Sequence, residues 1–248
     1  MFPIRDHNPS NRTPYVTWAI MALNIGIFIS YWGLMDQPMK LAWFYHDWAM
    51  TPGLITTGEK PVTLITSMFL HGGVLHLGGN MLFLWIFGDN MEDELGHFGF
   101  AAFYLAAGIA ASLAQVMADP ASLVPVVGAS GAIAGVMGGY LLLFPKAKVD
   151  ILFIFIVFFK IIPVPAWIML GLWFAFQLVS GVTSDVAGSG VAYWAHAGGF
   201  LIGFALMLPA WKKRGGTEFW DRTEGHPPHP EAEYTVTKSG IPKVKRRR

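Results

Sequence analysis

Three short motifs place polar side chains inside otherwise apolar stretches of the chain. Ser130 lies in the run G-A-S-G at residues 128–131. His76 and Asn80 stand four residues apart, and His196 lies near the start of the last apolar stretch. A serine hydroxyl attacks a carbonyl only when a base takes its proton, and the resulting oxyanion needs hydrogen-bond donors placed in advance. The set predicts a serine hydrolase with Ser130 as nucleophile and His196 as general base. The predicted oxyanion hole is His76, Asn80 and the backbone N–H of Ser130, which is free at a helix N-terminus.

Each of these side chains also has a purely structural interpretation. Small residues around a serine usually serve helix packing in membranes, and a lone buried polar side chain often bonds a backbone carbonyl. The hydrolase interpretation depends on depth, because helical rise places Ser130, His76 and His196 at similar depths below the outer membrane face. No Asp or Glu lies in the three spans that carry them. The sequence therefore predicts a Ser-His dyad and not a triad.

The composition is that of a helical membrane protein. Of 248 residues, 54% are hydrophobic and only 13% are charged, about half the charged share of a soluble domain. Apolar runs of about 18 to 20 residues recur, a length that crosses a bilayer as a helix. The chain has no cysteine, which excludes disulfides and thiolate metal sites, and it has no H-E-x-x-H motif. We expect the lipid bilayer as a partner, and no cofactor, metal or nucleic acid.

The hydrophobic pattern predicts an all-α, polytopic membrane protein with six transmembrane helices. The predicted spans are 16–34, 74–88, 98–117, 130–145, 165–179 and 191–208. The fourth is short, so Ser130 should lie below the membrane surface, and the irregular backbone before it should line a protein cavity. An acidic turn is expected at 89–97. The chain divides into an N-terminal segment 1–15, a six-helix membrane domain 16–211 and a polar, disordered tail 212–248.

The distribution of Lys and Arg sets the expected topology. Six spans put both termini on one side, together with nearly all basic residues outside the spans; only Lys40 and Lys60 fall on the other side. The positive-inside rule then makes both termini cytoplasmic. The apolar run 151–162 is too short to span and is expected in the interface, because a seventh span would send the basic tail outside. The loop 35–61, rich in aromatic and charged residues, is expected in the headgroup region.

Small residues recur at every fourth position on two of the predicted helices. Gly131 and Gly135 lie on the fourth span, and Gly199 and Gly203 lie on the sixth. Such faces allow two backbones to approach closely, as a hydrogen bond between the serine and the histidine requires. We predict that these four glycines pack the two helices together.

Taken together, the motifs resemble those of the rhomboid intramembrane serine proteases. The matching patterns are H-x4-H-x3-N at 71–80, G-A-S-G at 128–131 and A-H-x2-G-x3-G at 195–203. The resemblance covers about residues 16–211 and implies a rhomboid-like fold with the site assignment given above. It also implies that a transmembrane protein substrate enters sideways between the second and fifth spans, with residues 180–190 as a lid.

The chain departs from the family pattern at two places. Many members carry Trp-Arg in the first loop, where this chain has Val62-Thr63, and some bacterial members have a Tyr four residues after the serine, where this chain has Ala134. How the loop is anchored and how the histidine is supported are therefore left open.

The expected function is an intramembrane serine endopeptidase that cleaves transmembrane segments near the outer face of the bilayer. We expect it in a prokaryotic plasma (inner) membrane. The alternative is an inactive rhomboid-like scaffold that binds transmembrane helices. A channel or transporter is disfavoured, because the spans carry neither charged residues along a pore nor repeated half-folds.

Overall fold

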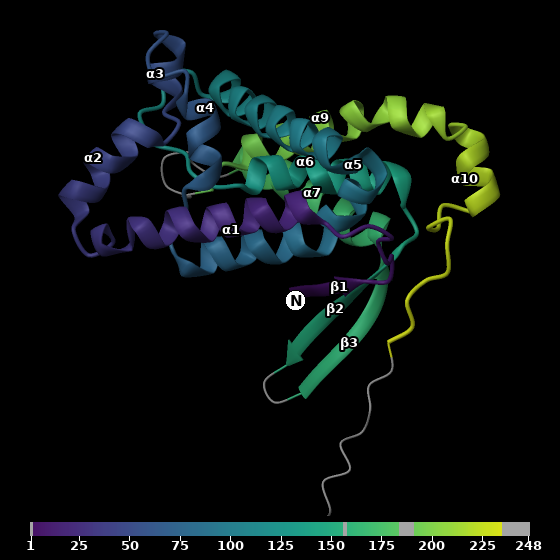
Figure 1. The fold of residues 1–248 in the computed structure, drawn as a ribbon. Helices are drawn as coiled ribbons and strands as arrows, with labels where there is room; N and C mark the ends of the chain where they lie inside the picture. Colours follow the sequence, from purple (N-terminus) through teal and green to yellow (C-terminus); the bar gives the residue numbers. More distant parts are fainter. Residues whose placement is uncertain (1, 156–157, 184–190, 235–248) are drawn as a thin grey trace, which may run out of the picture.

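The computed structural model describes residues 2–155, 158–183 and 191–234. Most of these residues form a helical bundle, and a small sheet projects from it (Figure 1). The helices are α1 (Tyr15–Ser30), α2 (Pro38–Trp48), α3 (Pro52–Thr56), α4 (Thr63–Thr66), α5 (Val74–Ala118), α6 (Ser130–Leu143), α7 (Ala166–Thr183), α9 (Tyr193–Lys213) and α10 (Thr217–Thr223). The strands are β1 (Phe2–Asp6), β2 (Lys148–Phe155) and β3 (Phe158–Pro165), and short 3-10 turns η1 (Trp32–Leu34) and η2 (Ser67–Phe69) complete the fold.

Three described helices, α5, α7 and α9, are long and apolar enough to cross a membrane, while α1 and α6 are apolar but shorter. The helix α5 has 45 residues and contains a break at Gly96, where φ is 68° and ψ is 165°. Glycine tolerates this positive φ, and the chain reverses direction there (Figure 1). The six predicted spans thus correspond to α1, the two halves of α5, α6, α7 and α9. Their number as membrane crossings stays a prediction.

The predicted acidic turn at 89–97 is wrong in extent, because helix α5 continues through this segment to a single break. The acidic side chains do not end the helix because the N-terminal segment supplies their partners. The carboxylate of Glu92 accepts backbone N–H groups of Val16 and Thr17 at 2.8 and 2.7 Å. The hydroxyl of Ser10 donates to Asp89 at 2.9 Å. The start of α1 is therefore held against the first half of α5.

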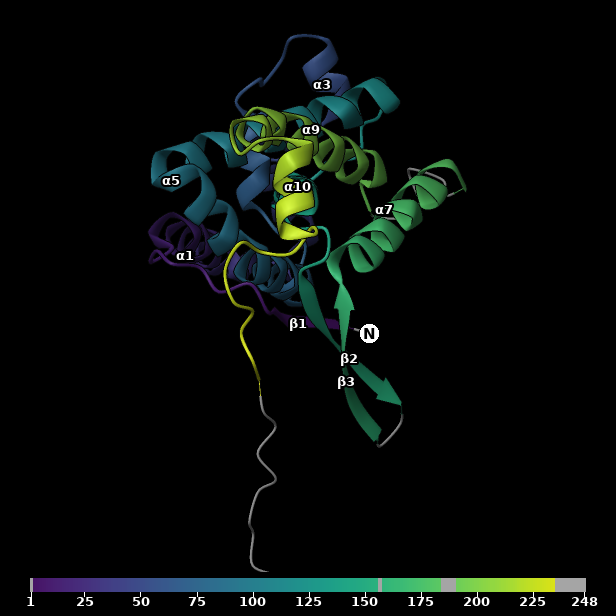
Figure 2. The ribbon, with the colours of Figure 1, turned by 90° about the vertical axis from the view of Figure 1, so that its right-hand side faces the viewer.

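The chain is mostly helical, as predicted, but it also contains a small three-stranded sheet that an all-α fold does not include. Residues 151–155 and 158–162 of the apolar run lie in the antiparallel strands β2 and β3, and β1 pairs with the other edge of β2. This run consists almost entirely of Ile, Phe, Leu and Val, and aromatic and β-branched residues favour strands. The hairpin projects away from the helices in both views (Figures 1 and 2).

The last helix extends beyond its predicted end, and part of the predicted tail is folded. Helix α9 continues through Pro209 to Lys213, beyond the predicted end of the span at residue 208. Helix α10 then lies across the end of the bundle (Figure 2). Its Phe219 is buried, and the indole N–H of Trp220 donates to the carbonyl of Leu142 at 2.9 Å. A disordered tail is therefore wrong for residues 212–234, and residues 235–248 lie outside the described part.

Helix α6 is the centre of the bundle and packs between α5 and α9. Nearly every residue from Ala132 to Leu143 is buried. A Cβ added to Gly203 would overlap the backbone of Gly135, and one added to Gly199 would overlap the carbonyl of Gly131. The backbones of α6 and α9 are thus in direct contact, which places the first turns of the two helices side by side.

Candidate active site

Ser130 is the first residue of α6, and an irregular loop leads into it. Gly128 has a φ of 133°, a conformation that other residues rarely adopt. Its N–H donates to the carbonyl of Ser67 at 2.9 Å. A Cβ on Gly128 would lie only 2.8 Å from Nε2 of His76. A glycine is therefore needed for the loop to pass between η2 and His76 before α6 begins.

The Ser130 hydroxyl and the His196 ring form a hydrogen-bonded pair. Oγ of Ser130 lies 2.7 Å from Nε2 of His196. The other ring nitrogen, Nδ1, lies 2.9 Å from Oε1 of Gln177. Because an amide oxygen only accepts, this contact assigns the ring hydrogen to Nδ1 and leaves Nε2 as the acceptor for the serine O–H. That tautomer is the one a general base requires.

Helix α7 supplies two residues of this site that sequence reasoning missed. Gln177 is buried, and the ring of Trp173, one turn earlier, has its centroid 5.8 Å from that of His196. A lone polar side chain in an apolar span is itself a functional signal, and it could have identified Gln177. Trp173 lies beside the histidine in this chain, where Ala134 replaces the tyrosine of some relatives. A second overlooked glutamine, Gln115 of α5, accepts the N–H of the residue before His196 at 3.2 Å.

His76 and Asn80 lie on one face of α5, toward the start of α6. Nδ1 of His76 accepts the N–H of Gly72 at 3.3 Å, which leaves Nε2 as the protonated nitrogen, on the side of Gly128. Asn80 is buried, and its Nδ2 has no hydrogen-bond partner among the described residues. Two side-chain donors therefore border the space in front of Ser130.

His71 anchors the non-helical segment that precedes α5. Its carbonyl accepts the hydroxyls of Tyr31 and Tyr45 at 2.9 and 3.2 Å, and its N–H donates to the Tyr31 oxygen at 2.7 Å. Its buried ring lies 5.1 Å from that of His76 between centroids. Tyr31, just after α1, and Tyr45, within α2, thereby fix the backbone immediately before α5, the helix that carries His76.

The four predicted side chains line one cavity of about 810 Å³. The rest of its lining is largely apolar and comes from α5, α6 and α7, with Phe83, Met137 and Trp173 as examples. The structure thus brings the predicted site residues together, and their catalytic roles stay predictions. Within the described ranges, no group of three or more His, Cys, Asp or Glu side chains is arranged to hold a metal ion.

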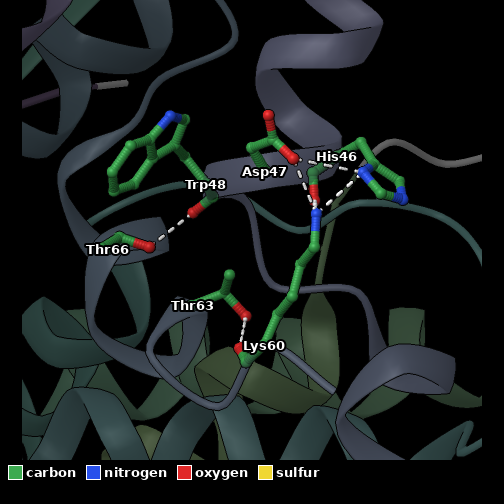
Figure 3. Close-up of polar contacts among 6 residues, drawn as sticks. All are labelled: His46, Asp47, Trp48, Lys60, Thr63 and Thr66. Carbon is green, nitrogen blue, oxygen red and sulfur yellow. Dashed lines mark hydrogen bonds and ion pairs between the residues drawn. The ribbon is translucent and has the colours of Figure 1, made fainter.

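The first loop is anchored without the Trp-Arg pair of many rhomboids (Figure 3). The ammonium of Lys60 donates to Asp47 at 2.7 Å and to the carbonyl of His46 at 2.9 Å. The hydroxyl of Thr63, within the divergent Val62-Thr63 pair, donates to the carbonyl of Lys60 at 2.7 Å. The hydrogen bond from Lys60, with a further one from His46, lowers the pKa of Asp47 below its ordinary value. The carboxylate is therefore charged at neutral pH and holds the lysine.

This loop also supports the segment that carries the serine. The hydroxyl of Thr66 donates to the carbonyl of Trp48 at 2.7 Å (Figure 3). Met50 and Val126 exchange backbone hydrogen bonds of 3.1 and 2.7 Å. The loop after α2 is therefore tied both to α4 and to the chain four residues before Ser130.

Comparisons with known proteins point to one family. The family model of the Rhomboid domain matches residues 58–213. The chain is 32% identical over 197 residues to Rhomboid protein 1, mitochondrial, of Saccharomyces cerevisiae, covering 76% of this chain and 51% of the relative. It is 36% identical over 160 residues to rhomboid protease GluP of Bacillus subtilis, covering 63% of this chain and 28% of the relative. It is 31% identical over 130 residues to Rhomboid-like protein 11, chloroplastic, of Arabidopsis thaliana, covering 52% and 42%.

The chain spans about half the length, or less, of these relatives. Their names place two of them in mitochondria and chloroplasts, and one is bacterial. The comparisons therefore do not support the prediction of a prokaryotic plasma membrane, and they favour no particular compartment. Membership of a membrane-protein family agrees with the long apolar helices, so this is an integral membrane protein.

Proposed function

This chain belongs to the rhomboid family, and we propose that it is an intramembrane serine endopeptidase that cleaves transmembrane segments of membrane proteins. The observation that carries the proposal is the 2.7 Å contact between Ser130 Oγ and His196 Nε2. The histidine is oriented from its other nitrogen by Gln177. This arrangement suits proton transfer from the serine, which a merely structural serine does not require.

The proposed reaction is acyl transfer to Ser130. Its Oγ attacks the scissile carbonyl carbon while its proton passes to Nε2 of His196. As the tetrahedral intermediate collapses, the same proton passes from Nε2 to the nitrogen of the leaving amine. A water then gives a proton to Nε2 and attacks the acyl carbon. As this second intermediate collapses, the proton passes from Nε2 to Oγ of Ser130, which releases the carboxylic acid and restores the serine hydroxyl.

The oxyanion is proposed to form against three donors. They are Nε2–H of His76, the Nδ2 amide of Asn80 and the backbone N–H of Ser130. The first two face the cavity without a described protein acceptor for these donor atoms, and the third lies in the first turn of α6, where N–H groups have no intrahelical partner. Donors fixed before the reaction stabilise the charge without reorganisation.

Membrane depth supports cleavage within the bilayer. Helix α6 has 14 residues and is about 21 Å long, shorter than a hydrocarbon core of about 30 Å. If its C-terminal end lies at the cytoplasmic interface, Ser130 lies below the outer surface. The first half of α5 and α7 both border the cavity, and α7 is exposed at Leu172 and Phe176. We therefore propose sideways substrate entry between these two helices, near the outer face.

The orientation in the membrane has its own test. We propose six crossings with both termini in the cytoplasm. Because the chain has no cysteine, the variants Thr57→Cys and Asp221→Cys each carry one thiol, at exposed sites of the first loop and of α10. In intact cells that express the variants in the plasma membrane, a membrane-impermeant maleimide should label the first thiol and spare the second. Labelling of both or of neither, or the reverse pattern, would contradict the proposed topology.

The proposed activity is tested by fluorophosphonate labelling of purified protein. Wild type should be labelled, and Ser130→Ala should lose both labelling and cleavage of transmembrane substrates. The matched control is Ser112→Ala, which removes a buried hydroxyl of α5 outside the cavity and should be labelled like wild type. If wild type resists the reagent and binds transmembrane peptides without cutting them, the inactive scaffold is correct instead.

A further inference from the structure

The distal half of the β2–β3 hairpin carries an exposed apolar face. Leu152 pairs with Ile161, and Ile154 pairs with Phe159. Paired residues share a sheet face, and residues two apart along a strand do so as well, so all four side chains point to one side. Ile154 is 49% exposed, Phe159 is 70% exposed and Ile161 is 39% exposed. No part of the described bundle covers these three side chains.

The opposite face of the same hairpin is the one that packs. Val149 and Ile151 are buried in the core, with Phe153 and Val164 packed against it. An antiparallel sheet that covers a core on one side normally carries polar residues on the other. Here the other side is polar only at the base, where Asp150 accepts hydrogen bonds from two basic side chains. Toward the tip this face becomes apolar, so the distal half of the hairpin exposes apolar side chains that water solvates poorly.

The surroundings of the hairpin indicate what covers this face. The hairpin connects α6 to α7, and in Figure 1 it slants down and to the left from that end of the bundle, passing below α1 and away from it. Its base continues directly into the exposed surface of α7, where Trp167 and Leu172 are 54% and 68% exposed. Trp is typical of membrane interfaces. The hairpin therefore leads directly into a membrane helix that also exposes apolar side chains.

Charge also favours lipid as the occupant. Lys146 and Lys148 flank the base of the hairpin, where Lys148 is paired with Glu231 at 2.6 Å, and Lys160 stands on the face opposite the apolar patch, paired with Phe153. Lysine can lie along apolar surface while its ammonium reaches the headgroups, and anionic headgroups attract basic residues near the surface.

We propose that the distal half of this hairpin inserts into the leaflet next to the C-terminal end of α6, with Leu152, Ile154, Phe159 and Ile161 in contact with acyl chains. It would be a monotopic anchor in a chain that also spans the bilayer. Since β3 runs directly into α7, the anchor fixes the start of the helix that carries Gln177. The proposal does not depend on proteolysis.

The absence of native cysteine allows a direct test. The variants Phe159→Cys and Ile161→Cys are each labelled with an environment-sensitive fluorophore and reconstituted into vesicles of phosphatidylcholine and phosphatidylglycerol. Asp221→Cys on α10 is the water-exposed control, and Leu172→Cys on α7 is the lipid-exposed control. Each protein is exposed to spin-labelled lipid and, separately, to iodide. A melting curve for each labelled variant confirms that it is folded.

Both hairpin probes should emit at shorter wavelength than the Asp221 probe. They should lose emission to spin-labelled lipid as the Leu172 probe does and resist iodide. Quenching of both hairpin probes by iodide, at the level of the Asp221 probe, would place the hairpin in water and overturn the proposal. Protection from both quenchers would also overturn it, because a protein surface, such as a second copy of the chain, would then cover the face. Two positions keep the test decisive if one variant fails to fold.

Discussion

The contact between Gln177 and His196 makes a prediction that distinguishes positioning from packing. In Gln177→Met the side chain keeps its length, but the amide oxygen that accepts Nδ1–H of His196 at 2.9 Å is lost. A neutral hydrogen bond contributes about 0.5–1.5 kcal/mol net, which corresponds to about two- to tenfold in rate. We expect a loss near the upper end, because the same bond also selects the reactive tautomer. The loss should be far smaller than the about ten-thousandfold effect of disturbing a charged orienting carboxylate, because glutamine is neutral.

The assay first measures the reactivity of the Ser130 hydroxyl and then the turnover of a substrate. The rate of fluorophosphonate labelling and kcat should both fall in Gln177→Met, while KM and the melting temperature change little. Gln177→Glu still offers an acceptor oxygen and should retain clearly more activity than the methionine variant. The control Ser180→Ala removes another buried polar side chain of α7, one turn further along, and should behave like wild type.

Two results would refute the positioning role. Full labelling rate and kcat in Gln177→Met would show that the histidine needs no partner on α7. Equal losses in the methionine and glutamate variants, accompanied by lower melting temperatures in both, would show that Gln177 acts only through packing.

Three further predictions concern the oxyanion hole, the tail and the sheet. Asn80→Ala should lower kcat about a hundredfold or more at nearly unchanged KM. Normal turnover in folded protein would show that Asn80 is not part of the oxyanion hole. Truncation after Arg214 should lower the melting temperature, because it removes the buried Phe219 and a buried aromatic contributes about 3–5 kcal/mol. Phe219→Ala should reproduce much of the loss, and an unchanged melting curve in both would show that α10 does not stabilise the bundle. Burial raises the pKa of Asp150, but hydrogen bonds from its two basic partners outweigh it and leave the pKa below 3.8. Its contribution to stability is thus present above that pH and lost as the pH falls through the lowered pKa. Asp150→Asn should be less stable near neutral pH and lose less on acidification, and parallel melting curves across the acid range would contradict this.

Much of the candidate site follows from local sequence spacing. The spacing of His76 and Asn80 puts them on one helix face, and the glycines of α6 and α9 indicate that two backbones touch. The short apolar stretch after Ser130 predicts a serine below the membrane surface. Each of these inferences depends on helical periodicity or helix length, which residues close in sequence determine.

The remaining features depend on contacts between segments far apart in the chain, which one sequence does not show. Gln177 lies 19 residues before His196, and only the packing of α7 against α9 brings its amide to the ring. The tail docks because the indole of Trp220 finds a carbonyl at the end of α6, although its polar composition indicates disorder. The apolar run 151–162 forms strands because each strand satisfies the other's backbone groups, whereas its composition alone fits an interfacial segment equally well. Composition and periodicity therefore determined the class of protein and predicted the Ser-His pair. Only the tertiary structure decided which side chain orients the histidine, since that depends on how α7 packs against α9.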